Sequence, residues 1–432
     1  MMENKFEKTG IQVAFGCFII MFIHLGTLGT AGLFIPQLIK TLNVPVSQVS
    51  LNVTFCSLTG FIFSLMVGKL SKKISARMMI FIGSVAGILH YSISAMTNGI
   101  LLLYIGSIIG GVKFGLGTHT CNAAIISQWF KDKKATVIGI VFSGAAFGSA
   151  VMMYISGILI ENIGWRSTYL IFAALHLFIA IPINLFVLKE VKVMRNDNIN
   201  VKHKASIDLS LFEFDEDSVT MKDVHRSMPF WMLFISMMLC GTLIVGFKTF
   251  VPSFWQLSGM PALTSSKYIS IFMVIATLAT MISGKIADKF GNEIYIVYLH
   301  SAFLIGMICI LLFSNKIDTI NVIIPVIFVA VAYPLYGSIP ATVATETFGI
   351  KNYDKVCGEL MAAFFIGQAI VSPIIGGLRD LTGSYIAGFK IIAVFGLVSC
   401  LLIECAFKIS AVKIKNKKTK SNINVDVEIK SA

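Results

Sequence analysis

The sequence has little charge for its length. Asp, Glu, Lys and Arg make up 13% of its 432 residues, whereas 56% are hydrophobic. An ordinary soluble domain cannot hide that much apolar surface, so the composition excludes one. No acidic residue lies deep inside any of the long apolar runs. The composition therefore predicts a polytopic membrane protein.

The sequence also lacks the patterns used by enzymes, metal sites and ATP-driven pumps. Its eight cysteines are scattered singly, without a C-x-x-C pair, so they indicate neither disulfides nor metal ligands. A phosphate loop ending in G-K-[ST] is absent, and so are H-E-x-x-H and G-x-S-x-G. We therefore expect no metal, no cofactor and no enzymatic activity, although a membrane-embedded enzyme stays open as an alternative class.

Twelve apolar stretches are long enough to cross a hydrocarbon core as helices, which takes about 17 to 25 residues. Helices are favoured over a barrel because the stretches lack two-residue alternation. The first stretch is too long in its apolar core for a cleaved signal peptide. We place the spans at 11–36, 51–67, 78–96, 100–126, 135–159, 165–188, 229–257, 268–286, 293–313, 322–344, 356–378 and 386–407.

The basic residues predict the orientation. Most of the 35 lysines and arginines fall in the two tails and in the loops on the same side as the tails. Cytoplasmic loops carry such an excess, so we expect a multi-pass protein of the plasma membrane with both termini in the cytoplasm. The basic run after the last span, KIKNKKTK, is expected to contact anionic lipids of the bilayer rather than nucleic acid.

A local pattern recurs after half the chain. The sequence GKLSKKISAR begins at Gly68, and GKIADKFGNE begins at Gly284, 216 residues later. Duplication at this period predicts an all-α membrane protein whose twelve helices form two similar six-helix bundles. The predicted boundaries are 1–188 for the N-terminal bundle, 189–228 for a cytoplasmic linker, 229–408 for the C-terminal bundle and 409–432 for the basic tail.

These motifs carry a family resemblance. GKIADKFGNE resembles the loop signature G-x-x-x-D-[RK]-x-G of the major facilitator superfamily, and GWRSTYL from Gly164 resembles the start of that family's sixth helix. A narrower resemblance, to the monocarboxylate porters and oxalate:formate antiporters, lies around the fourth and fifth spans. It rests on Phe130, Lys133, Lys134, Gly139, Gly144 and Gly148. The resemblance implies a secondary transporter that works by alternating access, with a small organic anion such as a monocarboxylate as substrate.

Two lysines lie inside otherwise uncharged runs. Lys113 is near the middle of 100–126, and Lys248 is inside 229–257. A charge at that depth costs on the order of 3 kcal/mol, so such residues usually face a water-filled cavity or a partner within the bundle. We expect both ammonium groups to meet an anionic substrate. Packing between helices stays open for Lys113, and extension toward the outer interface stays open for Lys248.

Further side chains are predicted to shape a substrate pocket. His24 can bind substrate or carry a proton, Trp255 shares a helix face with Lys248, and Gln368 offers hydrogen bonds. Tyr333 and Tyr336 lie in a proline-interrupted span, and interrupted helices often line a cavity. For each of these, a structural role is the alternative, and it is favoured for the remaining membrane histidines: His90, His119 and His176.

The two repeated loops are predicted to act as gates that lock an outward-open form. Their residues are Gly68, Lys69, Arg77, Gly284, Lys285 and Asp288. A proton or a counter-anion stays open as the coupling partner. The rival functions are export of amphipathic compounds or drugs, and a membrane sensor that keeps the carrier fold without transport.

Overall fold

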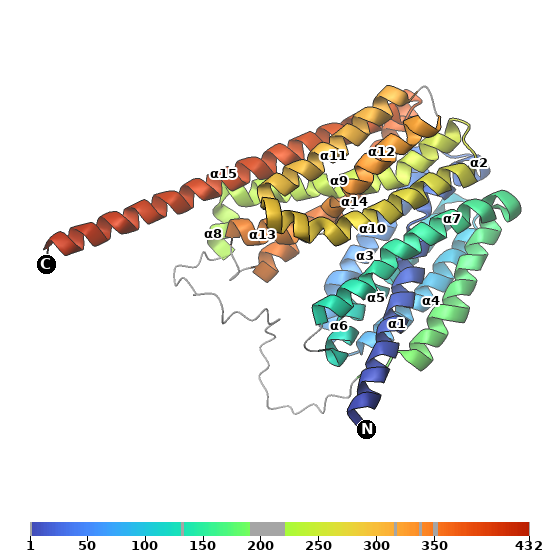
Figure 1. Cartoon of the computed structure of the whole chain (residues 1–432). Helices are drawn as coiled ribbons and strands as arrows, with labels where there is room; N and C mark the ends of the chain where they lie inside the picture. The colour runs from blue at the N-terminus through green and yellow to red at the C-terminus, as the bar shows by residue number, and fades with distance from the viewer. Residues whose placement is uncertain are drawn as a thin grey trace.

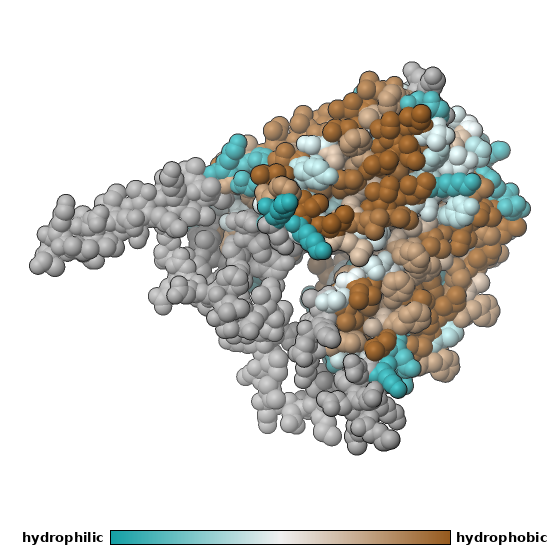
Figure 2. All heavy atoms as spheres, in the orientation of Figure 1, coloured by the Kyte–Doolittle hydropathy of each residue, from teal (hydrophilic) through white to brown (hydrophobic). Residues whose placement is uncertain are grey.

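The structure, a computed structural model, describes residues 2–130, 134–190, 221–314, 318–336, 339–348 and 353–431. Within these ranges every regular element is a helix. Ten helical segments are long and apolar enough to cross a membrane. Figure 2 shows hydrophobic side chains over the flanks of the molecule and hydrophilic ones near the helix ends. The prediction of an all-helical membrane protein is confirmed.

The first half of the chain, residues 2–190, forms what we call the N-terminal half (Figure 1). Its elements are α1 (Met2–Leu28), α2 (Ala31–Leu42), α3 (Val46–Leu70), α4 (Ala76–Ala95), α5 (Ile100–Gly117), α6 (His119–Trp129), α7 (Lys134–Leu175) and two π-helical turns, η1 (His176–Ala180) and η2 (Ile183–Val187).

The second half, residues 221–431, forms the C-terminal half. Its elements are α8 (Met221–Arg226), α9 (Met228–Leu257), α10 (Ala262–Phe290), α11 (Asn292–Phe313), α12 (Thr319–Val331), the 3-10 turn η4 (Tyr333–Tyr336), α13 (Ile339–Phe348), α14 (Tyr353–Thr382) and α15 (Ile386–Ser431). Most of the predicted linker, 191–220, lies outside the described residues, so the domain boundaries stay a prediction.

The apolar segments differ from the predicted spans in two places. Residues 136–187 form one segment of 52 residues, with a kink at Gly164, whose φ of 80° and ψ of 165° are not helical. The kink separates the predicted spans 135–159 and 165–188. The predicted span 322–344 is instead broken into α12, η4 and α13, because Pro334 cannot donate a backbone hydrogen bond to continue α12. The count of twelve therefore stays a prediction.

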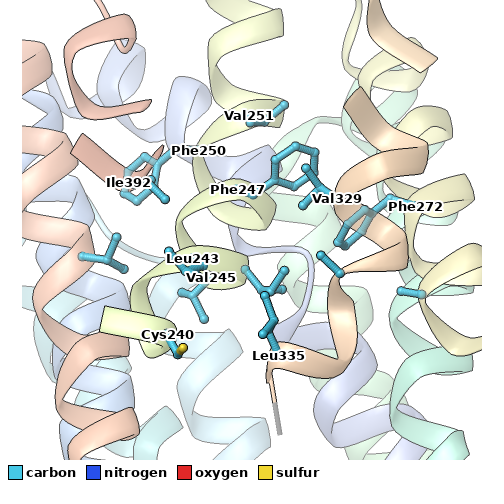
Figure 3. Packing of buried hydrophobic residues seen from close by; sticks show 14 of the residues in the cluster. Cys240, Leu243, Val245, Phe247, Phe250, Val251, Phe272, Val329, Leu335 and Ile392 are labelled. Carbon is cyan, nitrogen blue, oxygen red and sulfur yellow. The ribbon is translucent and has the colours of Figure 1, made fainter. Parts of the chain in front are cut away.

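Helix α9 is the centre of the C-terminal half. It packs against α14 and α15, and its side chains Phe247 and Phe250 are fully buried. Figure 3 shows Phe250 beside Ile392 of α15, with Phe247 directed toward Phe272 of α10 and Val329 of α12. The ring centroids of Phe247 and Phe272 are 5.1 Å apart, within the usual range for an aromatic pair.

The two halves meet along three helix pairs: α3 with α14, α7 with α10 and α2 with α9. Figure 1 shows them as the arms of a V, with α2 near the apex and the chain termini beyond the open ends. Hydrogen bonds join the halves near that apex, which we call the closed end. For example, the Ser253 hydroxyl donates to the Gly32 carbonyl over 2.7 Å, and the Ser270 hydroxyl donates to the Ala150 carbonyl over 2.8 Å.

Candidate functional site

Lys113 is fully buried inside the N-terminal half. Helix α5 carries it between α3 and α4, and the glycines around it let those helices approach closely. Its Nζ donates a hydrogen bond of 2.9 Å to the Tyr91 hydroxyl of α4 and lies 4.5 Å from the centroid of the Tyr91 ring. Both contacts lie within one half. In this conformation the contacts of Lys113 therefore match the packing alternative.

Three histidines gather around Lys113 and Tyr91 from three different elements. His24 of α1 stacks on His176 of η1 with 5.1 Å between ring centroids. The Tyr91 ring lies 5.4 Å from His176 and 4.4 Å from the neighbouring His90. No carboxylate contacts Lys113 among the described residues. The cluster is therefore polar and able to carry positive charge, and it has no internal counter-ion within the described part of the chain.

The histidines differ in how fully they are hydrogen-bonded. The His24 ring nitrogens lie 3.0 Å from the Gly117 carbonyl oxygen and 3.1 Å from the Ser84 hydroxyl oxygen. His176 Nδ1 lies 2.8 Å from the Phe172 carbonyl oxygen, but its buried Nε2 has no partner among the described residues. An unmet buried polar atom costs about 1–3 kcal/mol. The π-helical turn at His176 is of a kind often found at functional sites.

The sequence analysis had favoured a purely structural role for His90 and His176. Their approach to Lys113 depends on how α4 and η1 are rotated in the bundle. The spacing of the two residues along the chain does not reveal that rotation. Only the tyrosine adjacent to His90 could have drawn attention to this pair from the sequence.

Lys248 lies in the other half. It is half-buried on α9, between the fully buried Phe247 and the buried Thr249. Phe272 of α10 touches both Phe247 and Tyr333 of η4, with 6.0 Å between the ring centroids of Phe272 and Tyr333. The two predicted substrate-binding lysines are thus distributed over the two halves.

The remaining predicted pocket residues are dispersed within the C-terminal half. Trp255 is buried and packs its ring edge on Tyr268, with 5.9 Å between centroids. It also borders a void of about 10 Å³ against α11 and α12. Gln368 is buried on α14, where that helix passes close to Gly241 of α9. The side chain of Tyr336 lies outside the described residues. None of these placements tests the predicted roles.

The predicted gate loops are exposed at the ends of the arms. A Cβ atom on Gly68 or Gly284 would meet nothing within 4 Å. Lys69 and Lys285 are also exposed, whereas Arg77 donates to the carbonyl oxygens of residues 184 and 185 over 3.0 and 2.6 Å. The Asp288 side chain lies outside the described residues. Because this conformation is closed at the opposite end, the predicted lock of these loops stays a prediction.

The closed end itself contains polar contacts that the sequence analysis did not identify. The backbone N–H groups of Val46 and Ser47 donate to the two carboxylate oxygens of Asp380, over 2.9 and 2.8 Å. The Leu263 N–H donates to Glu161 over 2.7 Å. Beside Glu161 lies a depression of about 490 Å³ that residues of both halves line, including Lys40 and four others: Gln37, Ile160, Gln256 and Met260.

The fold with two joined halves, a closed end and diverging arms can be compared with known proteins. The sequence profile of the Major Facilitator Superfamily matches residues 17–350, more than half of the chain. The chain belongs to this superfamily. Members of the class are transporters, so the expectation that the protein is a membrane transporter and not an enzyme is confirmed.

Relatives of this superfamily protein span several substrates. It is 22% identical to the MFS-type transporter YhjX of Escherichia coli over 85% of this chain and 88% of that protein. It is 23% identical to monocarboxylate transporter 12 of Xenopus laevis, over 77% and 74% of the two chains. It is 19% identical to the nitrite extrusion protein of Bacillus subtilis, over 90% and 93%.

A solved structure shares the fold. The nucleoside transporter NupG superposes with a TM-score of 0.74 at 14% identity, covering 93% of this chain and 99% of that one. The suspected membership of the superfamily is confirmed, and the likeness to monocarboxylate transporters is borne out at low identity.

Proposed function

We propose that this superfamily transporter carries a small organic anion, such as a monocarboxylate, by alternating access between two six-helix halves. The kink at Gly164 and the broken segment α12–η4–α13 bring the spans to twelve in this proposal. Two of the relatives described above are named for anions, monocarboxylate and nitrite. Both termini would lie in the cytoplasm of a cell with the protein in its plasma membrane, so the conformation described here would be open to the cytoplasm.

The observation that carries the proposal is the uncompensated charge of Lys113. It is fully buried, and its described partner is a neutral tyrosine hydroxyl. A buried cation without a carboxylate is costly, and an anion that enters the membrane interior relieves part of that cost. The protein therefore offers an anion a favourable electrostatic environment at the depth of Lys113.

Lys113 acts in this proposal through its field. Its contacts lie inside the N-terminal half, whereas the substrate would lie between the halves and closer to Lys248. At about 8 Å and an effective dielectric constant of about 20, one ammonium attracts a unit negative charge by about 2 kcal/mol. That energy corresponds to roughly 30-fold in affinity. His24, Tyr333 and Gln368 would provide neutral hydrogen bonds around the same space.

The test begins with the ligand. Purified protein is screened by thermal shift against organic acids, amino acids and amphipathic drugs, because a ligand that binds only the folded state raises its apparent stability. The stabilising anion is then used in uptake assays with proteoliposomes. Lys113→Met is expected to lose roughly 30-fold in kcat/KM, whereas Lys113→Arg keeps most of the activity.

Lys40→Met is the matched control, because Lys40 is an exposed lysine at the closed end. It should transport the anion as the unaltered protein does. Full anion uptake by Lys113→Met would remove Lys113 from the proposal. Saturable flux of any substrate would exclude a sensor that only keeps the carrier fold.

One observation favours a second candidate, the export of amphipathic compounds. Aromatic rings meet where the halves join: Phe61 of α3 lies 5.5 Å from Phe365 of α14, and Phe114 of α5 lies 6.4 Å from the same ring. Such rings suit a flat apolar ligand. Stabilisation by amphipathic drugs, and not by organic acids, would favour this candidate over the anion transporter.

A further inference from the structure

Helices α3 and α10 both begin after a proline that cannot cap them. The N-cap residues are Pro45 and Pro261, and neither provides a side-chain hydrogen bond. The first backbone N–H groups of a helix have no partner within the helix, and an oxygen from Ser, Thr, Asp or Asn at the N-cap usually accepts from one of them. Both helices must therefore obtain their cap from elsewhere.

For α3 the cap comes from the other half. Asp380, in the last turn of α14, accepts the N–H groups of Val46 over 2.9 Å and Ser47 over 2.8 Å, one with each carboxylate oxygen. A negative charge at a helix N-terminus also interacts favourably with the helix dipole. Asp380 thus serves the first turn of a helix that is more than 300 residues away in the sequence.

For α10 the direction is reversed. Glu161, which precedes the kink of α7 in the N-terminal half, accepts the N–H of Leu263 over 2.7 Å. Each half therefore caps one helix of the other half. We call Asp380 and Glu161 the crossed caps.

The crossed caps occupy equivalent places in the repeat. Pro45 and Pro261 are 216 residues apart, the same separation as Gly68 and Gly284. Glu161 and Asp380 are 219 residues apart. The same separation of 219 relates the glycines that lie four residues before each cap and those that lie three residues after it. These are Gly157 with Gly376, and Gly164 with Gly383.

The glycine before each cap allows the close approach. A Cβ on Gly376 would lie 2.8 Å from the Cα of Ser47, and a Cβ on Gly157 would lie 3.0 Å from the Cα of Leu263. Real Cβ atoms do not come that close to backbone without displacing it. The two contacts are therefore alike in proline, capped N–H, carboxylate and glycine.

We propose that the crossed caps are a two-fold latch that holds the closed end shut and is released when the transporter opens on that side. Separating the halves removes the carboxylates from both helix N-termini at once. Each cap therefore stabilises the closed conformation and contributes nothing to the open one. The two contributions multiply in the ratio of closed to open molecules, because one rigid-body movement breaks both.

The experiment measures this ratio directly and needs no substrate. Nitroxide labels are placed at Leu101 of α5 and Ile320 of α12, which are 74% and 66% exposed at the closed end of each half. The partly or fully exposed native cysteines are first replaced by serine or alanine. They are Cys309, Cys357, Cys400 and Cys405. Electron–electron resonance in proteoliposomes then gives the populations of short and long label distances.

Loss of an N-cap changes an equilibrium by roughly fivefold. Asp380→Ala and Glu161→Ala are each expected to raise the long-distance population ratio by about fivefold, and the double variant by about 25-fold. The matched control is Glu190→Ala, because Glu190 accepts the Arg77 N–H over 2.9 Å within one half. It should leave the distance distribution unchanged.

A second pair of variants tests the latch through its glycines. Gly376→Ala forces α14 and α3 apart, so it should raise the long-distance population as Asp380→Ala does. Gly377→Ala is its control, because a Cβ there would meet nothing within 4 Å. Thermal melting confirms that each variant is folded before the distances are measured.

Two results would overturn the latch. One is a distance distribution that Asp380→Ala, Glu161→Ala and Gly376→Ala all leave as it is in the unaltered protein. The other is an equal shift in Glu190→Ala, which would assign the effect to general destabilisation. Failure of anion binding by Lys113 variants has no bearing on either result, so the latch and the proposed function are tested separately.

Discussion

The burial of Lys113 predicts an unusual effect on stability. Replacing the ammonium with an apolar group of similar length removes a charge that is costly to hold away from water, but it leaves the Tyr91 hydroxyl without its described donor. A buried hydroxyl without a partner costs about 1–3 kcal/mol. We therefore expect Lys113→Met alone to change the unfolding temperature little.

The double variant Lys113→Met with Tyr91→Phe removes both hydrogen-bonding partners. Replacing both members of a buried polar pair with apolar groups of the same shape is neutral or stabilising, by up to about 1–4 kcal/mol in measured ion pairs. Tyr91→Phe alone leaves the buried ammonium without the hydroxyl and should be the least stable of the three. The expected order of stability is the double variant, then Lys113→Met, then Tyr91→Phe.

Thermal unfolding of the purified variants, with and without a stabilising anion, measures both effects. A ligand at about 100 times its Kd stabilises a protein by about 2.7 kcal/mol. The double variant should keep or exceed the stability of the unaltered protein without ligand, while its stabilisation by the anion is reduced. A double variant that is less stable than Tyr91→Phe would refute the reasoning, because Lys113 would then be a stabilising structural charge.

Two glycine substitutions test the packing inside the halves by thermal unfolding. Gly367→Ala places a methyl group against a backbone carbonyl of α9 and should destabilise the protein by about 1–3 kcal/mol, whereas Gly358→Ala on the same helix meets no neighbour within 4 Å and should not. Equal stabilities would contradict the close packing of α9 on α14. Gly87→Ala places its methyl group 2.7 Å from His176 Nε2, so it should displace that ring and weaken the response to the anion, and an unchanged response would separate His176 from the site.

The sequence by itself determined the membrane character, the helical class and the duplicated organisation. These follow from local properties: the length of an apolar run is matched to the bilayer, and a repeat is visible as a fixed separation along the chain. It also marked Lys113 and Lys248 as the charges that need an explanation. The repeats that relate Pro45 to Pro261 and Glu161 to Asp380 were equally available, since they need only the printed sequence.

Only the tertiary structure decided where those side chains point and what they meet. The direction of Lys113 depends on the rotation of α5 against α4, and the gathering of His24, His90 and His176 depends on three elements that are distant in sequence. The caps of α3 and α10 are provided across the two halves, so no local pattern shows them. Spacing along the chain fixes which residues share a helix face, but the packing of one helix on another decides which faces meet.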